Sequence, residues 1–341
     1  MNPYHMDISA AKRAVIDAGH ELVARGLIAR TWGKISCRID EDRFAVTPSG
    51  MGYDRLTENE IVVVDCHTLL HEGDIKPSGE TGIHAAVYRL RPEANFAIHT
   101  HQNAASAISL AGFDALHPTA EERAVLGGDG AVPRAAYGLP CTKPLCKAVT
   151  RVLESSPANV LFMVRHGILA IGGSREEAFA RAAAVEHMCE RIVQTEAPTA
   201  KRAFDPAAMT AAILAADPSL KSVRFLDCDP VVRVSEYKRV LVPMLDDFAQ
   251  LIGTDIRCVS PDAAPAAAVS ALKGRNAVLI RGCGALCTGV NEEDATAVEY
   301  LLEKECRTEL NARAYGGAKP LPFFDRAVMR RIYVQKYSKL K

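Results

Sequence analysis

The first residues whose types and spacing could do chemistry are His99 and His101, which stand on either side of Thr100. They end a short run that is apolar from Phe96 onward, a pattern typical of a strand. Residues i and i+2 of a strand point to the same side, so the two imidazoles can share one cation. The alternative is that both are ordinary polar strand residues, one of them capped by a backbone carbonyl group.

A third histidine and a carboxylate could complete a metal site, because zinc-like cations need three or four ligands. His166 precedes Gly167 in a tight turn between two predicted strands, where its side chain can reach a cleft. Glu80 closes the loop 76–80 (KPSGE) at the start of a predicted helix. As a functional residue, Glu80 would be the acid and base beside the metal. As a structural residue, it would only complement the positive end of the helix dipole.

Three glycine-containing turns offer backbone N–H groups, hydroxyl groups and one ammonium group to an anion. They lie at 33–34, 47–50 and 78–79, the last at a helix N-terminus, where free N–H groups favour negative charge. Each turn alone is more often an ordinary turn, so the prediction depends on all three. The residues predicted to bind the anion are Gly33, Lys34, Ser49, Gly50, Ser78 and Gly79.

The predicted elements place these residues at strand ends and at the start of a helix. An amphipathic helix is predicted over 7–25 and a hairpin over 35–47. A second helix over 80–90 must end before Pro92, which cannot continue it. Several links between strands are too short for crossover helices. A mixed or antiparallel sheet covered by helices therefore fits better than a doubly wound parallel sheet.

Length and composition limit the remaining possibilities. The chain has 341 residues, with 41 Lys+Arg and 41 Asp+Glu, so two domains are expected and a nucleic-acid partner held by bulk charge is not. No apolar run is long enough to span a membrane. The start MNPYHMDISA has no apolar leader pattern, so the ten scattered cysteines predict reduced thiols of a cytoplasmic protein. The polar segment 196–202 predicts a linker between domains 1–196 and 203–341.

An internal repeat relates the two predicted domains. Residues 276–306 repeat the strand–turn–strand–helix pattern of residues 159–189, shifted by 117 positions, with His166 matching Cys283. The alternative is that the same common pattern arose twice. The identical residues are Asn159, Gly167, Leu169, Gly172, Glu176, Ala178, Glu186 and Cys189, which recur as Asn276, Gly284, Leu286, Gly289, Glu293, Ala295, Glu303 and Cys306.

Six separated motifs make the first 195 residues resemble the class II aldolase/adducin family. In chain order they are WGKIS at 32–36, TPSG at 47–50, KPSGE at 76–80, RPEAN followed by HTH at 91–101, AYGLP at 136–140 and RHG at 165–167. Their order and nearly their spacing are those of the family.

The resemblance implies a three-layer α/β/α sandwich around a mainly antiparallel sheet. It implies a divalent metal, usually zinc, held by His99, His101 and His166, with Glu80 as metal neighbour and proton shuttle. Substrate phosphate would be bound by the three glycine turns. Family members are commonly tetramers, so a homo-oligomer is expected. Residues 203–341 would form a smaller α/β domain that is a degenerate partial copy of the first.

The function that follows is that of a metal-dependent lyase of the aldolase type. It would cleave or form a carbon–carbon bond of a small ketose phosphate or hydroxy-keto acid through a metal-stabilised enediolate. A sugar-phosphate epimerase, a decarboxylase and a dehydratase use the same chemistry and stay open. A non-catalytic, adducin-like binding module is the alternative from another class, against which the retained histidines and Glu80 count.

Three positions depart from the pattern of the aldolases. Lys34 stands where they have asparagine, and Gly79 stands where they often have a second serine. His117 is followed by Pro118 instead of the tyrosine that serves as acid for the departing aldehyde, and Tyr137 belongs to another motif. The metal ligands therefore match the family pattern. The residues expected to bind the phosphate and to protonate the departing aldehyde do not.

Overall fold

The computed structural model describes residues 5–25, 27, 33–110, 118–127, 130–192, 200–314 and 319–335. The chain divides into two compact units. The first reaches Ile192, and the second contains the described residues from Ala200 onward. His117 and residues 196–199 of the predicted linker lie outside the described residues. Within the described residues, no helix combines the length and the apolar composition that a membrane span requires.

A seven-stranded sheet forms the centre of the first unit. The strand order is β3-β2-β1-β4-β7-β6-β5, and all neighbours are antiparallel except the edge pair β5–β6, so the sheet is mixed. The α/β class predicted from the sequence is confirmed. The strands are β1 (Lys34–Arg38), β2 (Arg43–Val46), β3 (Val62–Asp65), β4 (Phe96–Thr100), β5 (Arg134–Ala135), β6 (Val160–Met163) and β7 (Gly167–Gly172), with a 3-10 turn at Tyr53–Arg55.

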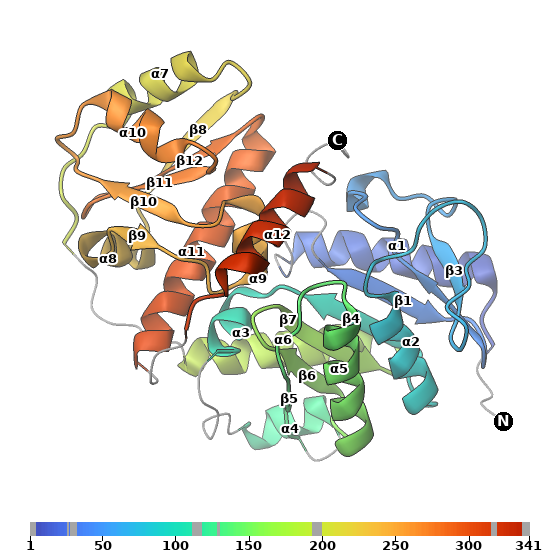
Figure 1. Ribbon diagram of the computed structural model, residues 1–341. Coiled ribbons are helices and arrows are strands. Elements are labelled where there is room, and N and C mark those ends of the chain that lie inside the picture. Colours follow the sequence, from blue (N-terminus) through green and yellow to red (C-terminus); the bar gives the residue numbers. More distant parts are fainter. Residues whose placement is uncertain are drawn as a thin grey trace. The chain divides into compact units, whose positions relative to one another are not determined.

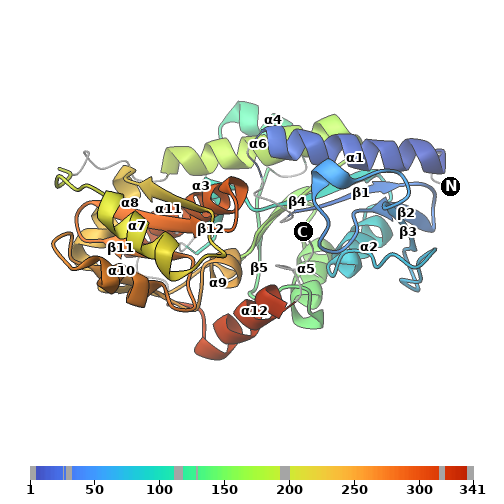
Figure 2. The ribbon, with the colours of Figure 1, turned by 90° about the horizontal axis from the view of Figure 1, so that it is seen from above.

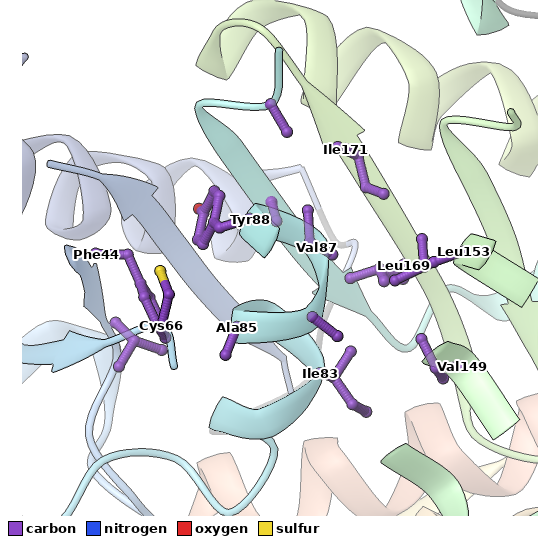
Figure 3. Close-up of a cluster of buried hydrophobic side chains, with 14 of the residues drawn as sticks. Phe44, Cys66, Ile83, Ala85, Val87, Tyr88, Val149, Leu153, Leu169 and Ile171 are labelled. Atoms are coloured by element: carbon purple, nitrogen blue, oxygen red, sulfur yellow. The ribbon is translucent and has the colours of Figure 1, made fainter. Parts of the chain in front are cut away.

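Helices cover both faces of this sheet. They are α1 (Ile8–Ala24), α2 (Thr81–Leu90), α3 (Asn103–Ile108), α4 (Ala120–Leu126), α5 (Lys143–Ser155) and α6 (Arg175–Ile192). Helices α1, α3 and α6 pack on one face, with α4 on α6, while α2 and α5 pack together on the other face (Figures 1 and 2). The core under α2 and α5 includes Phe44, Val87, Leu153 and Ile171 (Figure 3).

Local signals explain where the helices begin and which face they bury. The Asp7 carboxylate caps α1 by accepting from the Ala10 N–H group. Apolar residues then recur every three or four positions and are buried, namely Ala11, Val15, Ala18 and Leu22. The predicted helices over 7–25 and 80–90 and the hairpin over 35–47 are confirmed within one or two residues.

The second unit has a five-stranded sheet of order β8-β12-β11-β10-β9, in which only β10–β11 is parallel. Helices α7 and α10 pack on one face, α8 and α11 pack on the other, and α12 packs on α9. The elements are β8 (Ser222–Leu226), β9 (Val240–Leu241), β10 (Ile256–Val259), β11 (Ala277–Ile280), β12 (Gly284–Gly289), α7 (Ala207–Ala216), α8 (Asp229–Tyr237), α9 (Asp246–Leu251), α10 (Pro265–Leu272), α11 (Glu292–Ala314) and α12 (Phe323–Gln335).

Corresponding strands of the two units pair with the same register within each unit. The β6–β7 hairpin pairs Val160 with Ala170, and the β11–β12 hairpin pairs Ala277 with Cys287, in each case 117 positions later. The left-handed conformation in the connecting turn recurs too, with φ of 71° at Arg165 and 68° at Gly282.

The next strand of each sheet follows the same correspondence. Strand β4 pairs Thr100 with Ile168, and β8 pairs Leu226 with Ala285. By this register, Phe225 and Asp227 stand where the first unit has His99 and His101, and Cys283 stands at the place of His166.

Three buried ionisable side chains lie between α9 and α11 in the second unit. Lys304 forms an ion pair with Asp247, and both side chains are buried. The neighbouring Glu305 carboxyl accepts from the backbone N–H groups of Met244 and Leu245, at 2.6 and 3.2 Å. Burial raises the pKa of Glu305 to about 8, and the nearby Asp247 carboxylate adds to the shift.

We therefore expect Glu305 to make the stability of the protein depend on pH. Its pKa is higher in the folded state than in the unfolded state, so the folded protein holds an extra proton between about pH 4.5 and pH 8. The free energy of unfolding should fall as pH rises through this window, by at most about 1.4 kcal/mol per pH unit. Urea unfolding of wild type and Glu305→Gln from pH 5 to pH 8.5 checks this. Parallel pH profiles for the two proteins would contradict it.

Candidate metal centre

The three predicted metal ligands meet at one end of the first unit's sheet. His99 lies on β4, His101 follows directly after β4, and His166 lies in the turn between β6 and β7. One ring nitrogen of each lies within 4.8 Å of the others, and all three side chains are buried. The ring centroids are 4.6 to 4.7 Å apart.

The backbone turn before β7 explains how His166 reaches β4. Gly167 has a φ of 154°, and a Cβ atom there would lie 2.1 Å from the Thr100 carbonyl oxygen. Only glycine permits this close approach of the turn to β4. The preceding Arg165 is left-handed, its backbone N–H donates to Ser109 Oγ at 3.2 Å, and its guanidinium lies 5.7 Å from the centre of the Tyr137 ring.

Hydrogen bonding fixes which nitrogen of His99 can bind a cation. His99 Nδ1 lies 2.8 Å from the Ile168 carbonyl oxygen, which accepts only, so Nδ1 carries the proton and donates it. Burial holds the pKa of His99 well below its ordinary value, so the ring is neutral. Its Nε2 therefore presents a lone pair to His101 Nε2, 2.9 Å away. This is the arrangement typical of a histidine ligand oriented by a carbonyl group.

Glu80 brings a negative charge to the three imidazoles. Its Oε1 lies 2.7 Å from His166 Nε2 and its Oε2 lies 3.6 Å from His99 Nε2. Burial is the largest single effect and by itself would raise the pKa of Glu80. The nearby His166, His99 and Lys34 side chains together outweigh it, so the pKa lies well below its ordinary value. Glu80 is the N-cap residue of α2, yet its side chain makes no capping hydrogen bond. Complementing the helix dipole is thus not what orients it.

The donor set fits a divalent cation. Glu80 Oε2 is buried and has no hydrogen-bond partner among the described residues. An ionised carboxylate oxygen in that position is costly unless a positive charge approaches it. A cation held by the nitrogen atoms of His99, His101 and His166 would supply that charge, and three imidazoles beside one carboxylate suit zinc.

The three predicted anion loops lie side by side in the first unit. The Ser49 N–H group donates to the Lys76 carbonyl, and the Ser78 N–H group donates to the Thr47 carbonyl. Thr47 in turn bonds to Ile35 through backbone and hydroxyl groups, which joins the turn at 33–34 to the other two. Lys34 stands opposite His99 in the register of β1 and β4.

The loop before α2 offers fewer free donors than the sequence predicts. The Ser78 N–H group is bonded to Thr47, the Glu80 N–H group donates to Ser78 Oγ, and the Thr81 N–H group donates to the Ser78 carbonyl. These donors serve the loop itself. An anion at these loops would therefore depend more on the charge of Lys34 and the hydroxyl group of Ser49 than on the helix N-terminus.

Cys141 explains the departure at Gly79, and sequence reasoning gave it no role there. A Cβ atom at Gly79 would lie 2.7 Å from Cys141 Sγ and 2.8 Å from Cys141 Cβ. The thiol thus occupies the space that a serine side chain would need. Cys141 has a φ of 61° and lines a cavity of about 190 Å³, which Glu80 and Lys143 also line. None of the ten cysteines forms a disulfide.

Comparison with known proteins places the chain in a family. The sequence profile of the family described as "Class II Aldolase and Adducin N-terminal domain" matches residues 13–193 and again residues 201–310. The chain belongs to this family.

Two relatives and one solved structure are similar to parts of this chain. An L-fuculose phosphate aldolase of Escherichia coli strain K12 is 31% identical over 194 residues, which are 57% of this chain and 87% of that protein. An L-ribulose-5-phosphate 4-epimerase of Salmonella paratyphi C is 37% identical over 103 residues, 30% of this chain and 45% of that protein. A solved L-fuculose 1-phosphate aldolase, 30% identical, matches 55% of this chain and 86% of that chain with a TM-score of 0.49.

The contact between Gly79 and Cys141 gives a test by paired substitution. Gly79→Ser should lower the free energy of unfolding by about 1–3 kcal/mol, because the new side chain overlaps Cys141. Adding Cys141→Gly removes both clashing atoms and should restore most of the loss. Gly173→Ser, whose new Cβ atom would meet neighbours only at 3.5 Å or more, is the control. Additive effects of the two substitutions in urea unfolding would contradict the contact.

Proposed function

We propose that the first unit is a divalent-metal-dependent lyase of the aldolase type. It cleaves or forms a carbon–carbon bond in a small ketose phosphate or hydroxy-keto acid. The observation that carries the proposal is the buried Glu80 carboxyl group, which lies 2.7 Å from His166 Nε2 and 3.6 Å from His99 Nε2 beside three buried imidazoles. A scaffold protein has no need to bury such a charge, because a buried ionised group without full compensation lowers stability.

The metal in this proposal is zinc, and His99, His101 and His166 would hold it. When bound, it would act as a Lewis acid that polarises a substrate carbonyl and stabilises the charge of an enediolate. The Ile168 carbonyl orients the His99 ring, and Gly167 lets His166 approach β4. The donor atoms are thus held in place by backbone contacts.

Glu80 is the residue proposed to move the substrate proton. Its low pKa makes it a carboxylate at neutral pH, and Oε2 has no hydrogen-bond partner among the described residues. That oxygen can accept a proton from a carbon next to a carbonyl group and later return it. Lys34 and Ser49 would hold the substrate's phosphate or carboxylate as a point charge and a hydroxyl donor.

The substrate class follows from the named relatives, which act on L-fuculose phosphate and L-ribulose-5-phosphate. A 4-epimerase is the second candidate, favoured by the 37% identity over 103 residues. A decarboxylase or a dehydratase would use the same centre. Assays of dihydroxyacetone phosphate, pyruvate and glycolaldehyde against a panel of aldehydes, with a ribulose phosphate for epimerisation, discriminate among these reactions.

We propose further that residues 203–341 are a degenerate partial copy of the first domain without a metal site. The second match of the family profile, over 201–310, and the shared strand register support this. Phe225, Asp227 and Cys283 at the three ligand positions cannot repeat the histidine set. Assembly into a homo-oligomer belongs to the same proposal.

Metal analysis tests the ligand assignment. Protein purified without chelators should hold about one divalent cation per chain, and His166→Ala should lose it. His187→Ala changes an exposed histidine on α6, and Cys283→Ala changes the matching position of the second unit, so both should keep the metal. Less than a tenth of an equivalent in the wild type would overturn the enzyme proposal.

Glu80→Gln tests the proton shuttle. The variant should keep its metal but exchange the proton at the enediolate carbon of dihydroxyacetone phosphate about 10²- to 10⁴-fold more slowly, since an amide cannot accept that proton. Exchange with deuterated water followed by mass spectrometry measures the rate. Glu154→Gln, which changes an exposed residue of α5, is the control. Exchange at the wild-type rate in Glu80→Gln would rule out the assigned role.

A further inference from the structure

A chain of hydrogen bonds runs under α2, one turn from Glu80. The Tyr88 hydroxyl lies 2.7 Å from Ser36 Oγ, and Ser36 Oγ lies 2.6 Å from His84 Nδ1. All three side chains are buried, with exposures of 3%, 0% and 0%. The other ring nitrogen, His84 Nε2, is buried and has no partner among the described residues.

The chain joins one face of β1 to one face of α2. Lys34, Ser36 and Arg38 alternate along β1 and so point to the same side of the sheet. His84 and Tyr88 are four residues apart on α2 and share its inner face. Arg38 holds Tyr88 in place, donating to its carbonyl at 2.7 Å and lying 4.8 Å from its ring centre.

Counting protons decides the direction of these hydrogen bonds. If Ser36 donated to Tyr88, the tyrosine proton would have no acceptor, because Ser36 is the sole partner of that hydroxyl among the described residues. His84 Nε2 would then be a second unpaired group. If Ser36 accepted from both Tyr88 and His84 Nδ1, the Ser36 proton and His84 Nε2 would be the two unpaired groups. If Tyr88 donates to Ser36 and Ser36 donates to His84 Nδ1, the only unpaired group of the three side chains is the N–H group at His84 Nε2. Since a buried unpaired polar group costs about 1–3 kcal/mol, this last direction is favoured.

The favoured direction fixes the tautomer of His84. Nδ1 accepts, so the single proton of the neutral ring is on Nε2. Burial supports the neutral form, lowering the pKa of His84 to about 4; Glu80 opposes this shift and Lys34 adds to it. The ring thus presents a fixed N–H donor. It is close enough to the Glu80 carboxylate and the Lys34 ammonium group for both charges to affect its pKa.

We propose that His84 is a positioning residue whose Nε2–H group holds one oxygen atom beside Glu80. The oxygen is that of a water molecule in the resting protein or that of a bound substrate. Either would complete the hydrogen bonding of the buried donor. The proposal rests on the proposed function for its catalytic meaning, whereas the tautomer and the bound oxygen do not depend on it.

Two measurements test the geometry without any activity. In NMR spectra of ¹⁵N-histidine-labelled protein, His84 should give the signals of a neutral ring protonated on Nε2. In the Ser36→Ala variant, the signals should indicate a mixture of the two tautomers. A crystal structure of the substrate-free protein should show a water oxygen within about 3.2 Å of His84 Nε2. Protonation on Nδ1, or a protein atom bonded directly to Nε2, would overturn the proposal.

Paired substitutions then test the role in the reaction. Gln places an amide nitrogen near the position of Nε2 and keeps the donor, whereas Asn reaches only the position of Nδ1 and lacks it. His84→Asn should lower the proton-exchange rate about tenfold or more with the metal content unchanged, and His84→Gln should recover most of the rate. A fall in kcat alone identifies the oxygen as water, and a rise in KM identifies it as substrate.

The outcomes separate this inference from the proposed function. Equal losses in His84→Asn and His84→Gln, or losses that follow thermal stability, would show a purely structural residue and overturn the role. If the wild type exchanged no proton in any substrate, the proposed function would fail. The tautomer and the bound water would still decide whether His84 holds an oxygen.

Discussion

The burial of one ionised carboxylate is the constraint on which the rest of the first unit depends. Taking a carboxylate out of water is costly unless charge and hydrogen bonds replace the lost hydration. Glu80 is 4% exposed. Its Oε1 lies 2.7 Å from His166 Nε2, and its Oε2 lies 3.6 Å from Nε2 of the neutral His99 ring, so side chains from different parts of the sheet surround it. The end of β4, the turn before β7 and the start of α2 must therefore meet at one point, and Gly167 supplies the close approach that this requires.

Neutral histidines lie close to this carboxylate, and backbone or hydroxyl groups fix their protons. The Ile168 carbonyl accepts from His99 and leaves its Nε2 lone pair for a cation. By our inference, Ser36 donates to His84 and leaves its Nε2 as a donor. The same ring type thus provides an acceptor in one place and a donor in the other. The difference lies entirely in the group that bonds to Nδ1.

The meeting of His99, His101 and His166 could be predicted from the sequence because its signals are local. Strand alternation at His99 and His101, and a glycine turn at His166, need no knowledge of distant contacts. The packing of Cys141 against Gly79 and the chain from Ser36 to Tyr88 could not be predicted, since each depends on which elements face one another. The parallel edge pair β5–β6 was missed for a similar reason: a strand of two residues carries no periodic signal.

The shared register of the two hairpins has a thermodynamic consequence. The β11–β12 hairpin keeps the pairing and the left-handed turn residue of β6–β7 although Cys283 replaces the histidine. This turn therefore does not require a histidine at that position. In the first unit, a cation would therefore bind to a turn that is already folded. Little of its binding free energy would be spent on folding the turn, so most of it would appear as affinity. Small domains that fold only around their metal differ in this respect.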